Sequence, residues 1–115
     1  WMYVATATHR RLTEKALKTA GIDHYFRGIG TAADAGNHKS ESADIYEMAM
    51  RRLQSNKRDT VVFEDALHAI RTAKAAGFRV AGVYEATAEQ DQPEIQRLCD
   101  YYIRSYEELV QSETF

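Results

Sequence analysis

Two adjacent carboxylates, Glu64 and Asp65, stand directly after a short run of β-favouring residues at positions 61–63. Apolar residues on consecutive positions are expected of a parallel strand that is covered on both faces. A helical pattern of small side chains starts at Ala66 and stops at Gly77, a residue type that often ends helices. The sequence therefore predicts that the two carboxylates lie at the carboxyl end of a strand, where open α/β sheets bind their ligands.

This acidic pair has two interpretations. Adjacent carboxylates at the end of a strand can hold a hard divalent cation such as Mg²⁺, either directly or through its water molecules. Alternatively, Asp65 only caps the following helix, and Glu64 only places a favourable charge near the helix dipole. The pair alone does not decide between a metal site and a helix cap, so the choice depends on the other motifs of the chain.

A second group of candidate residues lies near the start of the chain. Residues 1–5 are predicted to form a buried strand that ends at Thr6, Ala7 and Thr8. Hydroxyl groups and free amides at the start of a helix can bind a phosphate, although Thr8 could instead only cap the helix. The helix that follows is expected to end at Gly21. Its inner face is expected to consist of Leu12, Ala16, Leu17 and Ala20.

The remaining pattern predicts an alternation of strands and helices. Further strands are expected at residues 25–29, 79–84 and 101–103, helices at 43–53 and after Pro93, and a helical turn at 106–110. This alternating order calls for right-handed crossovers and a parallel sheet flanked by helices. A chain of 115 residues is expected to form one domain.

The composition argues against several classes of function. A net charge of -2 provides no basic surface for nucleic acid. We find no apolar run long enough to span a membrane and no signal peptide, and the single cysteine, Cys99, suits a reducing compartment. The histidines share no metal-binding spacing and are interpreted as surface or capping residues. We therefore expect a cytoplasmic protein without nucleic-acid or membrane partners.

Three motifs, taken in order, resemble the haloacid dehalogenase-like (HAD) hydrolase superfamily, especially its phosphoglycolate phosphatase and β-phosphoglucomutase members. The stretch YVATAT at residues 3–8 resembles the strand end with which the family binds phosphate. Lys39, ahead of DIY at 44–46, resembles the family's phosphate-binding lysine, and FED at 63–65 resembles its metal-binding motif. The resemblance covers nearly the whole chain.

The resemblance implies a role for each of these residues. The hydroxyl of Thr6, the amide of Ala7 and the ammonium of Lys39 would bind the transferring phosphoryl group and stabilise its oxygens. The carboxylates of Glu64 and Asp65 would hold Mg²⁺. The implied enzyme is a Mg²⁺-dependent phosphatase of small phosphorylated metabolites that works through an aspartyl-phosphate intermediate, or a related phosphomutase.

The same resemblance implies that part of the enzyme lies outside these residues. The expected fold is a Rossmann-like parallel sheet flanked by helices, in which residues 1–115 form the C-terminal part of a HAD-like core domain without its first strand and without the cap domain. The family's nucleophile belongs to an Asp-x-Asp motif that this sequence does not contain. Because Trp1 already lies inside a predicted strand, we expect a missing N-terminal segment or a second copy to complete the sheet, and these residues alone to be inactive.

Two other functions are consistent with parts of the pattern. A non-catalytic binding module of receiver-like or flavodoxin-like shape would use the acidic strand end only for a cation. A fragment with a purely structural role would use none of the motifs. The presence of Thr6 and Lys39 together with the acidic pair favours the enzyme.

Overall fold

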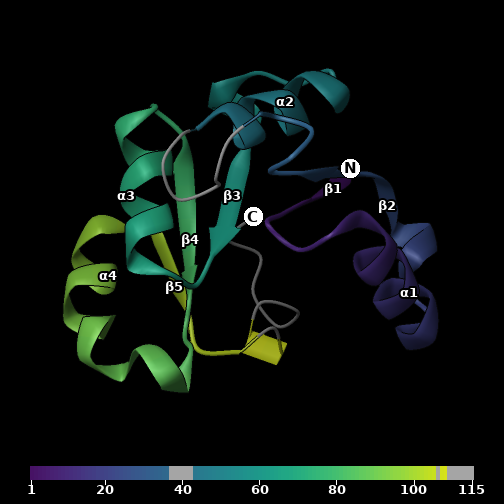
Figure 1. Ribbon diagram of the computed structural model, residues 1–115. Coiled ribbons are helices and arrows are strands. Elements are labelled where there is room, and N and C mark those ends of the chain that lie inside the picture. Colours follow the sequence, from purple (N-terminus) through teal and green to yellow (C-terminus); the bar gives the residue numbers. More distant parts are fainter. Residues whose placement is uncertain (37–42, 106, 109–115) are drawn as a thin grey trace. The chain divides into compact units, whose positions relative to one another are not determined.

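A computed structural model describes residues 1–36, 43–105 and 107–108 of the chain (Figure 1). The chain divides into two compact units, Trp1–Asp59 and Thr60–Phe115. The first contains a two-stranded sheet and the second a three-stranded sheet, and all pairings within them are parallel. The predicted α/β class with parallel sheets flanked by helices is thereby confirmed.

The first unit alternates strands and helices around its small sheet. Its described elements are β1 (Met2–Thr6), α1 (Arg10–Ala20), η1 (Asp23–Tyr25), β2 (Phe26–Thr31), α2 (Asp44–Arg52) and η2 (Lys57–Asp59). Strands β1 and β2 pair with Thr6 opposite Thr31, and α1 and α2 lie on opposite sides of these strands (Figure 1). The parallel pairing brings the carboxyl ends of both strands to the same edge of the sheet.

The second unit continues the alternation. Its described elements are β3 (Val61–Glu64), α3 (Leu67–Ala75), β4 (Arg79–Val83), η3 (Ala86–Asp91), α4 (Gln92–Leu98) and β5 (Tyr101–Ile103). The strand order is β3-β4-β5, and α3 and α4 lie on the same side of these strands (Figure 1). Right-handed crossovers between strands that are added in one direction place successive helices on one side of a sheet.

Most of the buried hydrophobic side chains belong to the second unit. Ile70, Val80 and Ile95 are 0% exposed, and Ala69 and Ala73 of α3 are 2% and 0% exposed. Small side chains on this helix face allow it to approach the strands closely. Full burial of one isoleucine contributes about 1.5–3 kcal/mol to folding, so these contacts form the main core of the second unit.

The predicted helix ends are confirmed by the backbone. Gly21, which ends α1, has φ 73°, and Gly77, which follows α3, has φ 92°. Both values lie in the left-handed region, which glycine enters without a steric penalty. The predicted helical turn at 106–110 falls mostly outside the described residues.

None of the helices in the described residues is long and apolar enough to cross a membrane.

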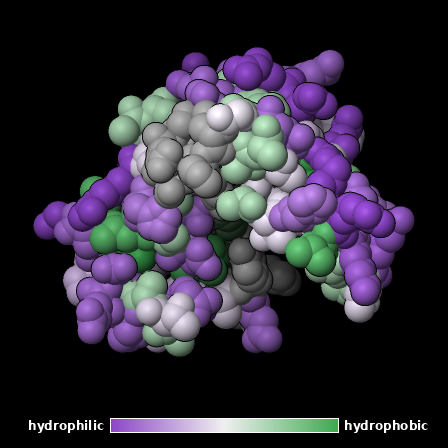
Figure 2. Space-filling model, in the orientation of Figure 1, coloured by the Kyte–Doolittle hydropathy of each residue, from purple (hydrophilic) through white to green (hydrophobic). Residues whose placement is uncertain are grey.

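The predicted inner face of α1 is wrong. No residue of α1 is buried, Ala16 and Ala20 are exposed, and Leu12 is 62% exposed. Within this unit, α1 has only a two-stranded sheet to cover, and a groove of about 360 Å³ lies between α1 and β2. A sheet of this width is too narrow to bury a full helix face, and Figure 2 shows a mainly hydrophilic surface over α1.

Two strands are also less buried than predicted. Phe63 of β3 is 39% exposed, whereas Val62 and Glu64 are 9% and 7% exposed. Alternate side chains of a strand point to opposite faces, and in this unit both helices lie on the same side of the sheet. At the start of β1, Trp1 is 89% exposed, and its ring stacks against the guanidinium of Arg27, 3.4 Å from the ring centroid.

Candidate active site

The acidic pair lies where the sequence places it, at the carboxyl end of a strand. Glu64 is the last residue of β3, and Asp65 follows it before α3 begins. The side chain of Glu64 is buried, that of Asp65 is exposed, and the Asp65 N–H donates to Glu64 Oε1 at 3.2 Å. One carboxylate is therefore held in place by the fold, and its neighbour faces solvent.

The helix-cap interpretation of Asp65 is wrong. The N-cap of α3 is Ala66, in extended conformation, and this residue makes no side-chain capping hydrogen bond. Asp65 lies one residue before the N-cap, the position from which a side chain normally accepts a hydrogen bond from a backbone N–H of the first helical turn. A helix cap therefore does not account for the presence of Asp65, and the metal-site interpretation of the pair stays a prediction.

The electrostatic environment of Asp65 disfavours its charged form. Partial desolvation, the negative charge of Glu64 and a hydrogen bond with that residue raise the pKa of Asp65 above its usual range, and the charge of Glu85 adds to the effect. A bound cation would remove this repulsion, because it would interact favourably with both carboxylates. The arrangement is thus suited to share a positive charge.

Glu85 is a third carboxylate near this site that the sequence reasoning missed. It comes two residues after the end of β4, and its Oε1 accepts from the Thr87 N–H at 3.2 Å and from the Thr87 hydroxyl at 3.3 Å. The signal that could have found it is the same as for Glu64, namely an acidic residue following a predicted strand. Among the described residues, however, no group of three or more His, Cys, Asp or Glu could hold a metal ion.

The candidate phosphate ligands lie at the end of β1 in the first unit. The Thr6 carbonyl accepts from Ala32 N–H at 3.0 Å, which fixes this strand end against the residue after β2. Thr6 Oγ1 accepts from Thr8 N–H, also at 3.0 Å, and its own hydroxyl proton can still be donated to an anion. Ala7 is exposed, and the part of the chain that the structure describes provides no acceptor for its N–H.

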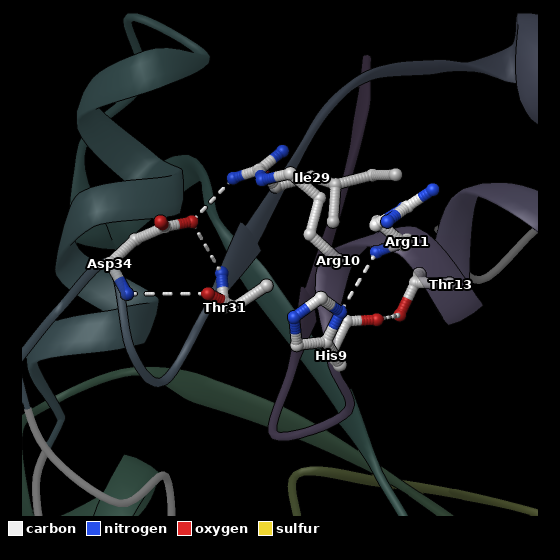
Figure 3. A network of polar contacts seen from close by, with 7 residues as sticks. All are labelled: His9, Arg10, Arg11, Thr13, Ile29, Thr31 and Asp34. Atoms are coloured by element: carbon white, nitrogen blue, oxygen red, sulfur yellow. Dashed lines mark hydrogen bonds and ion pairs between the residues drawn. The ribbon is translucent and has the colours of Figure 1, made fainter.

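Thr8 does not cap α1. The N-cap is His9, whose Nδ1 accepts from the Arg11 N–H at 3.3 Å (Figure 3). This confirms the interpretation of His9 as a capping residue and removes the alternative role that was open for Thr8. The short segment between β1 and α1 thus ends in a cap of its own. Among the residues that the structure describes, none takes the hydroxyl proton of Thr6 or the N–H of Ala7.

The predicted site residues divide between the two units. Thr6 and Ala7 belong to the first unit, and Glu64 and Asp65 belong to the second. Lys39 lies outside the described residues. The grouping of all five residues around one phosphate therefore stays a prediction, whereas the position of two groups at carboxyl ends of parallel strands is observed.

Comparison with known proteins decides the family. A sequence model of the haloacid dehalogenase-like hydrolases matches residues 2–83, a range that includes all five predicted site residues. The chain belongs to this family. The resemblance seen in the three sequence motifs is thereby confirmed.

Characterised relatives include phosphatases. The chain is 33% identical to the fructose-1-phosphate phosphatase YqaB of Escherichia coli (strain K12) over 82 residues, which are 71% of this chain and 43% of that protein. It is 39% identical to protein CbbY of Cereibacter sphaeroides over 79 residues, 66% of this chain and 34% of that protein. The chain thus matches less than half of the length of either HAD relative.

Solved structures support the same fold. A candidate beta-phosphoglucomutase from Thermotoga maritima superposes with a TM-score of 0.81 at 25% identity, covering 98% of this chain and 52% of that one. A HAD phosphatase from Thermococcus onnurineus gives a TM-score of 0.77 at 24% identity, covering 95% of this chain and 48% of that one. The HAD-like fold therefore extends over nearly all of the chain.

Proposed function

We propose that this chain is part of a Mg²⁺-dependent phosphatase that hydrolyses small phosphorylated metabolites through an aspartyl-phosphate intermediate. The observation that carries the proposal is the acidic pair Glu64–Asp65 at the end of β3, which does not occupy the N-cap position of α3, in a chain that belongs to the HAD-like hydrolases. The activity of the relatives supports the reaction class. A phosphomutase uses the same retained residues and remains the related alternative.

The residues of the acidic pair fit Mg²⁺. Carboxylate oxygens are the ligands that this hard cation prefers, and desolvation together with the charge of Glu64 already raises the pKa of Asp65. When bound, the ion would offset the repulsion between an anionic nucleophile and an anionic phosphate. Buried Glu64 would hold its carboxylate in a fixed position, and Asp65 would supply the second one.

The strand end at Thr6 would bind the phosphate. The Thr6 hydroxyl and the Ala7 N–H are neutral hydrogen-bond donors. They can stabilise the negative charge that develops on the phosphate oxygens without transferring a proton. Lys39 would add a positive charge to the same oxygens. These groups bind and orient the phosphoryl group, and none of them acts as nucleophile.

The nucleophile must come from outside these residues. The sequence contains no Asp-x-Asp motif, and the chain covers only about half of the solved HAD protein that it resembles over 98% of its own length. We propose that an N-terminal segment supplies the missing carboxylate, and that either this segment or a second copy of the chain completes the sheet. Residues 1–115 would then form the C-terminal part of the core domain.

The test measures hydrolysis of p-nitrophenyl phosphate by the product of the complete reading frame that contains these residues. Asp65→Asn and Glu64→Gln should each lower kcat/KM by at least about 100-fold, because several kcal/mol of charge stabilisation by the metal would be lost. Chelation of Mg²⁺ should have the same effect on the unmodified protein. Asp91→Asn is the matched control, because Asp91 precedes α4 without capping it through its side chain.

Two outcomes would contradict the proposal. Full turnover of Asp65→Asn, or full activity after chelation, would exclude the metal role of the pair. Mg²⁺ binding by a folded product that hydrolyses no phosphomonoester would instead favour the non-catalytic binding module.

A further inference from the structure

An arginine at the start of α1 connects the two loops at the carboxyl edge of the first sheet. Arg10 Nη2 donates to the carbonyl of Ile29 at 2.9 Å and forms an ion pair with Asp34 Oδ2 (Figure 3). The same Asp34 oxygen accepts from the Thr31 N–H at 2.9 Å, and Asp34 N–H donates to Thr31 Oγ1 at 3.2 Å. The Arg10 guanidinium thus binds both the C-terminal part of β2 and the loop that follows this strand.

This connection lies next to the candidate phosphate ligands. Thr6 is opposite Thr31 in the parallel register, and its carbonyl accepts from the residue after Thr31. Arg10 comes four residues after Thr6, at the end of the short segment that carries Ala7. The segment is therefore fixed at both ends to the β2 strand end, by a backbone hydrogen bond on one side and by Arg10 on the other.

The ion pair is poorly placed to serve global stability. The side chains of Arg10 and Asp34 are 43% and 39% exposed, and exposed ion pairs typically contribute little to the free energy of unfolding. The hydrogen bond from the Thr31 N–H, assisted by Arg10, holds the pKa of Asp34 below its usual range, so the carboxylate stays charged near neutral pH. A permanent charge pair whose side chains also bind two backbone groups, the Ile29 carbonyl and the Thr31 N–H, is better suited to fix local geometry.

We propose that Arg10 and Asp34 are positioning residues that hold the Thr6 hydroxyl and the Ala7 amide in the geometry needed to bind the transferring phosphoryl group. This inference rests on the proposed phosphatase function. Neither residue has to touch the substrate, because each acts through the loop that it holds. A displacement of about 1 Å in a reacting group can cost roughly 100-fold in rate, so a small relaxation of this loop should be visible in turnover.

The first experiment replaces Arg10 by methionine in the product of the complete reading frame. With p-nitrophenyl phosphate and saturating Mg²⁺, kcat should fall by about 10-fold or more while KM changes by less than about 3-fold, since alignment matters most in the transition state. Arg11→Met is the matched control, because Arg11 is the next residue of α1 and is exposed. It should leave kcat and KM unchanged.

Further variants separate positioning from a loss of folding. Asp34→Asn keeps an oxygen acceptor for the Thr31 N–H but removes the charge that pairs with Arg10, so it should reproduce the lower kcat even if Arg10→Met does not fold. Arg10→Lys retains a point charge without the planar fork and should recover part of the lost kcat. In these variants, inhibition by orthovanadate should weaken in parallel with the fall in kcat. Their midpoints of thermal unfolding should stay well above the assay temperature.

The outcomes distinguish this inference from the proposed function. Unchanged turnover in Thr6→Val would overturn the proposed role of the phosphate ligand itself. If Thr6→Val loses activity while Arg10→Met and Asp34→Asn keep the full kcat, the positioning inference fails and the proposed function stands. A fall in kcat that follows only a loss of folded protein would also overturn the inference.

Discussion

At the scale of single residues, the proposed metal-binding role of the acidic pair is accompanied by an electrostatic cost. The pKa of Asp65 is raised from 3.8 by partial desolvation and by Glu64, so the folded state binds this proton more tightly than the unfolded state does. Such a carboxyl contributes most to the free energy of unfolding at low pH. This contribution is lost as the pH rises from 3.8 through the pKa of the folded state. Near neutral pH, ionised Asp65 therefore opposes folding.

Asp65→Asn should consequently stabilise the metal-free protein. We expect the free energy of unfolding at pH 7 to rise by about 0.5 kcal/mol, a small value because the exposed side chain is screened by solvent. The gain should shrink towards pH 4, where the native carboxyl becomes protonated. Urea denaturation at both pH values measures the difference, with Asp91→Asn as control; a variant that is less stable than the native protein at pH 7 would contradict the assigned repulsion.

At the scale of elements, a glycine decides how closely α4 packs on β4. A Cβ placed at Gly82 would lie 2.6 Å from Cys99 Sγ and 2.9 Å from Ile95 Cγ2. Ile95 is completely buried, so it has little room to move. Close packing of the strand against this helix therefore requires a residue without a side chain at position 82.

Gly82→Ala should lower the free energy of unfolding by about 1–3 kcal/mol, the usual cost of overpacking a tight core. Adding Cys99→Ala removes the sulfur that the new methyl group would meet, so Gly82→Ala should cost less in that background than in the native one. Chemical denaturation of the four proteins of this cycle gives both values. Equal costs in the two backgrounds would show that Cys99 is not the limiting contact.

At the scale of the whole molecule, this chain would supply only part of the proposed magnesium site. Mg²⁺ prefers near-octahedral coordination by oxygen ligands, whereas the acidic pair offers two carboxylates, and the described residues include no larger cluster of metal-binding side chains. The proposed nucleophile would be the missing ligand. Metal affinity should therefore depend on completion of the core rather than on these residues alone.

Titration calorimetry of the isolated 115 residues should give a Kd for Mg²⁺ of about 1 mM or weaker, because few protein ligands replace its tightly held water. A protein that adds an Asp-x-Asp strand to this chain should bind at least about 10-fold more tightly. Asp65→Asn should abolish binding in both. Micromolar binding by the isolated chain would mean that it already contains a complete site.

The sequence by itself determined the features that depend on local pattern. Strand and helix alternation, the stops at Gly21 and Gly77, and the position of Glu64 and Asp65 after a strand follow from residues within one turn or one strand of each other. The three motifs in order were sufficient to predict the family, which the match over residues 2–83 confirms. Local periodicity carries this information because side-chain spacing reflects backbone geometry directly.

Only the tertiary structure decided which surfaces are covered and which distant residues meet. The exposure of Leu12 and Phe63 depends on how much sheet and helix faces them, which their own periodicity does not contain. The pair of Arg10 and Asp34 joins residues 24 positions apart, and it forms because the parallel register of β1 and β2 brings the start of α1 to the end of β2. Such contacts arise from the packing of whole elements, so no spacing rule along the chain predicts them.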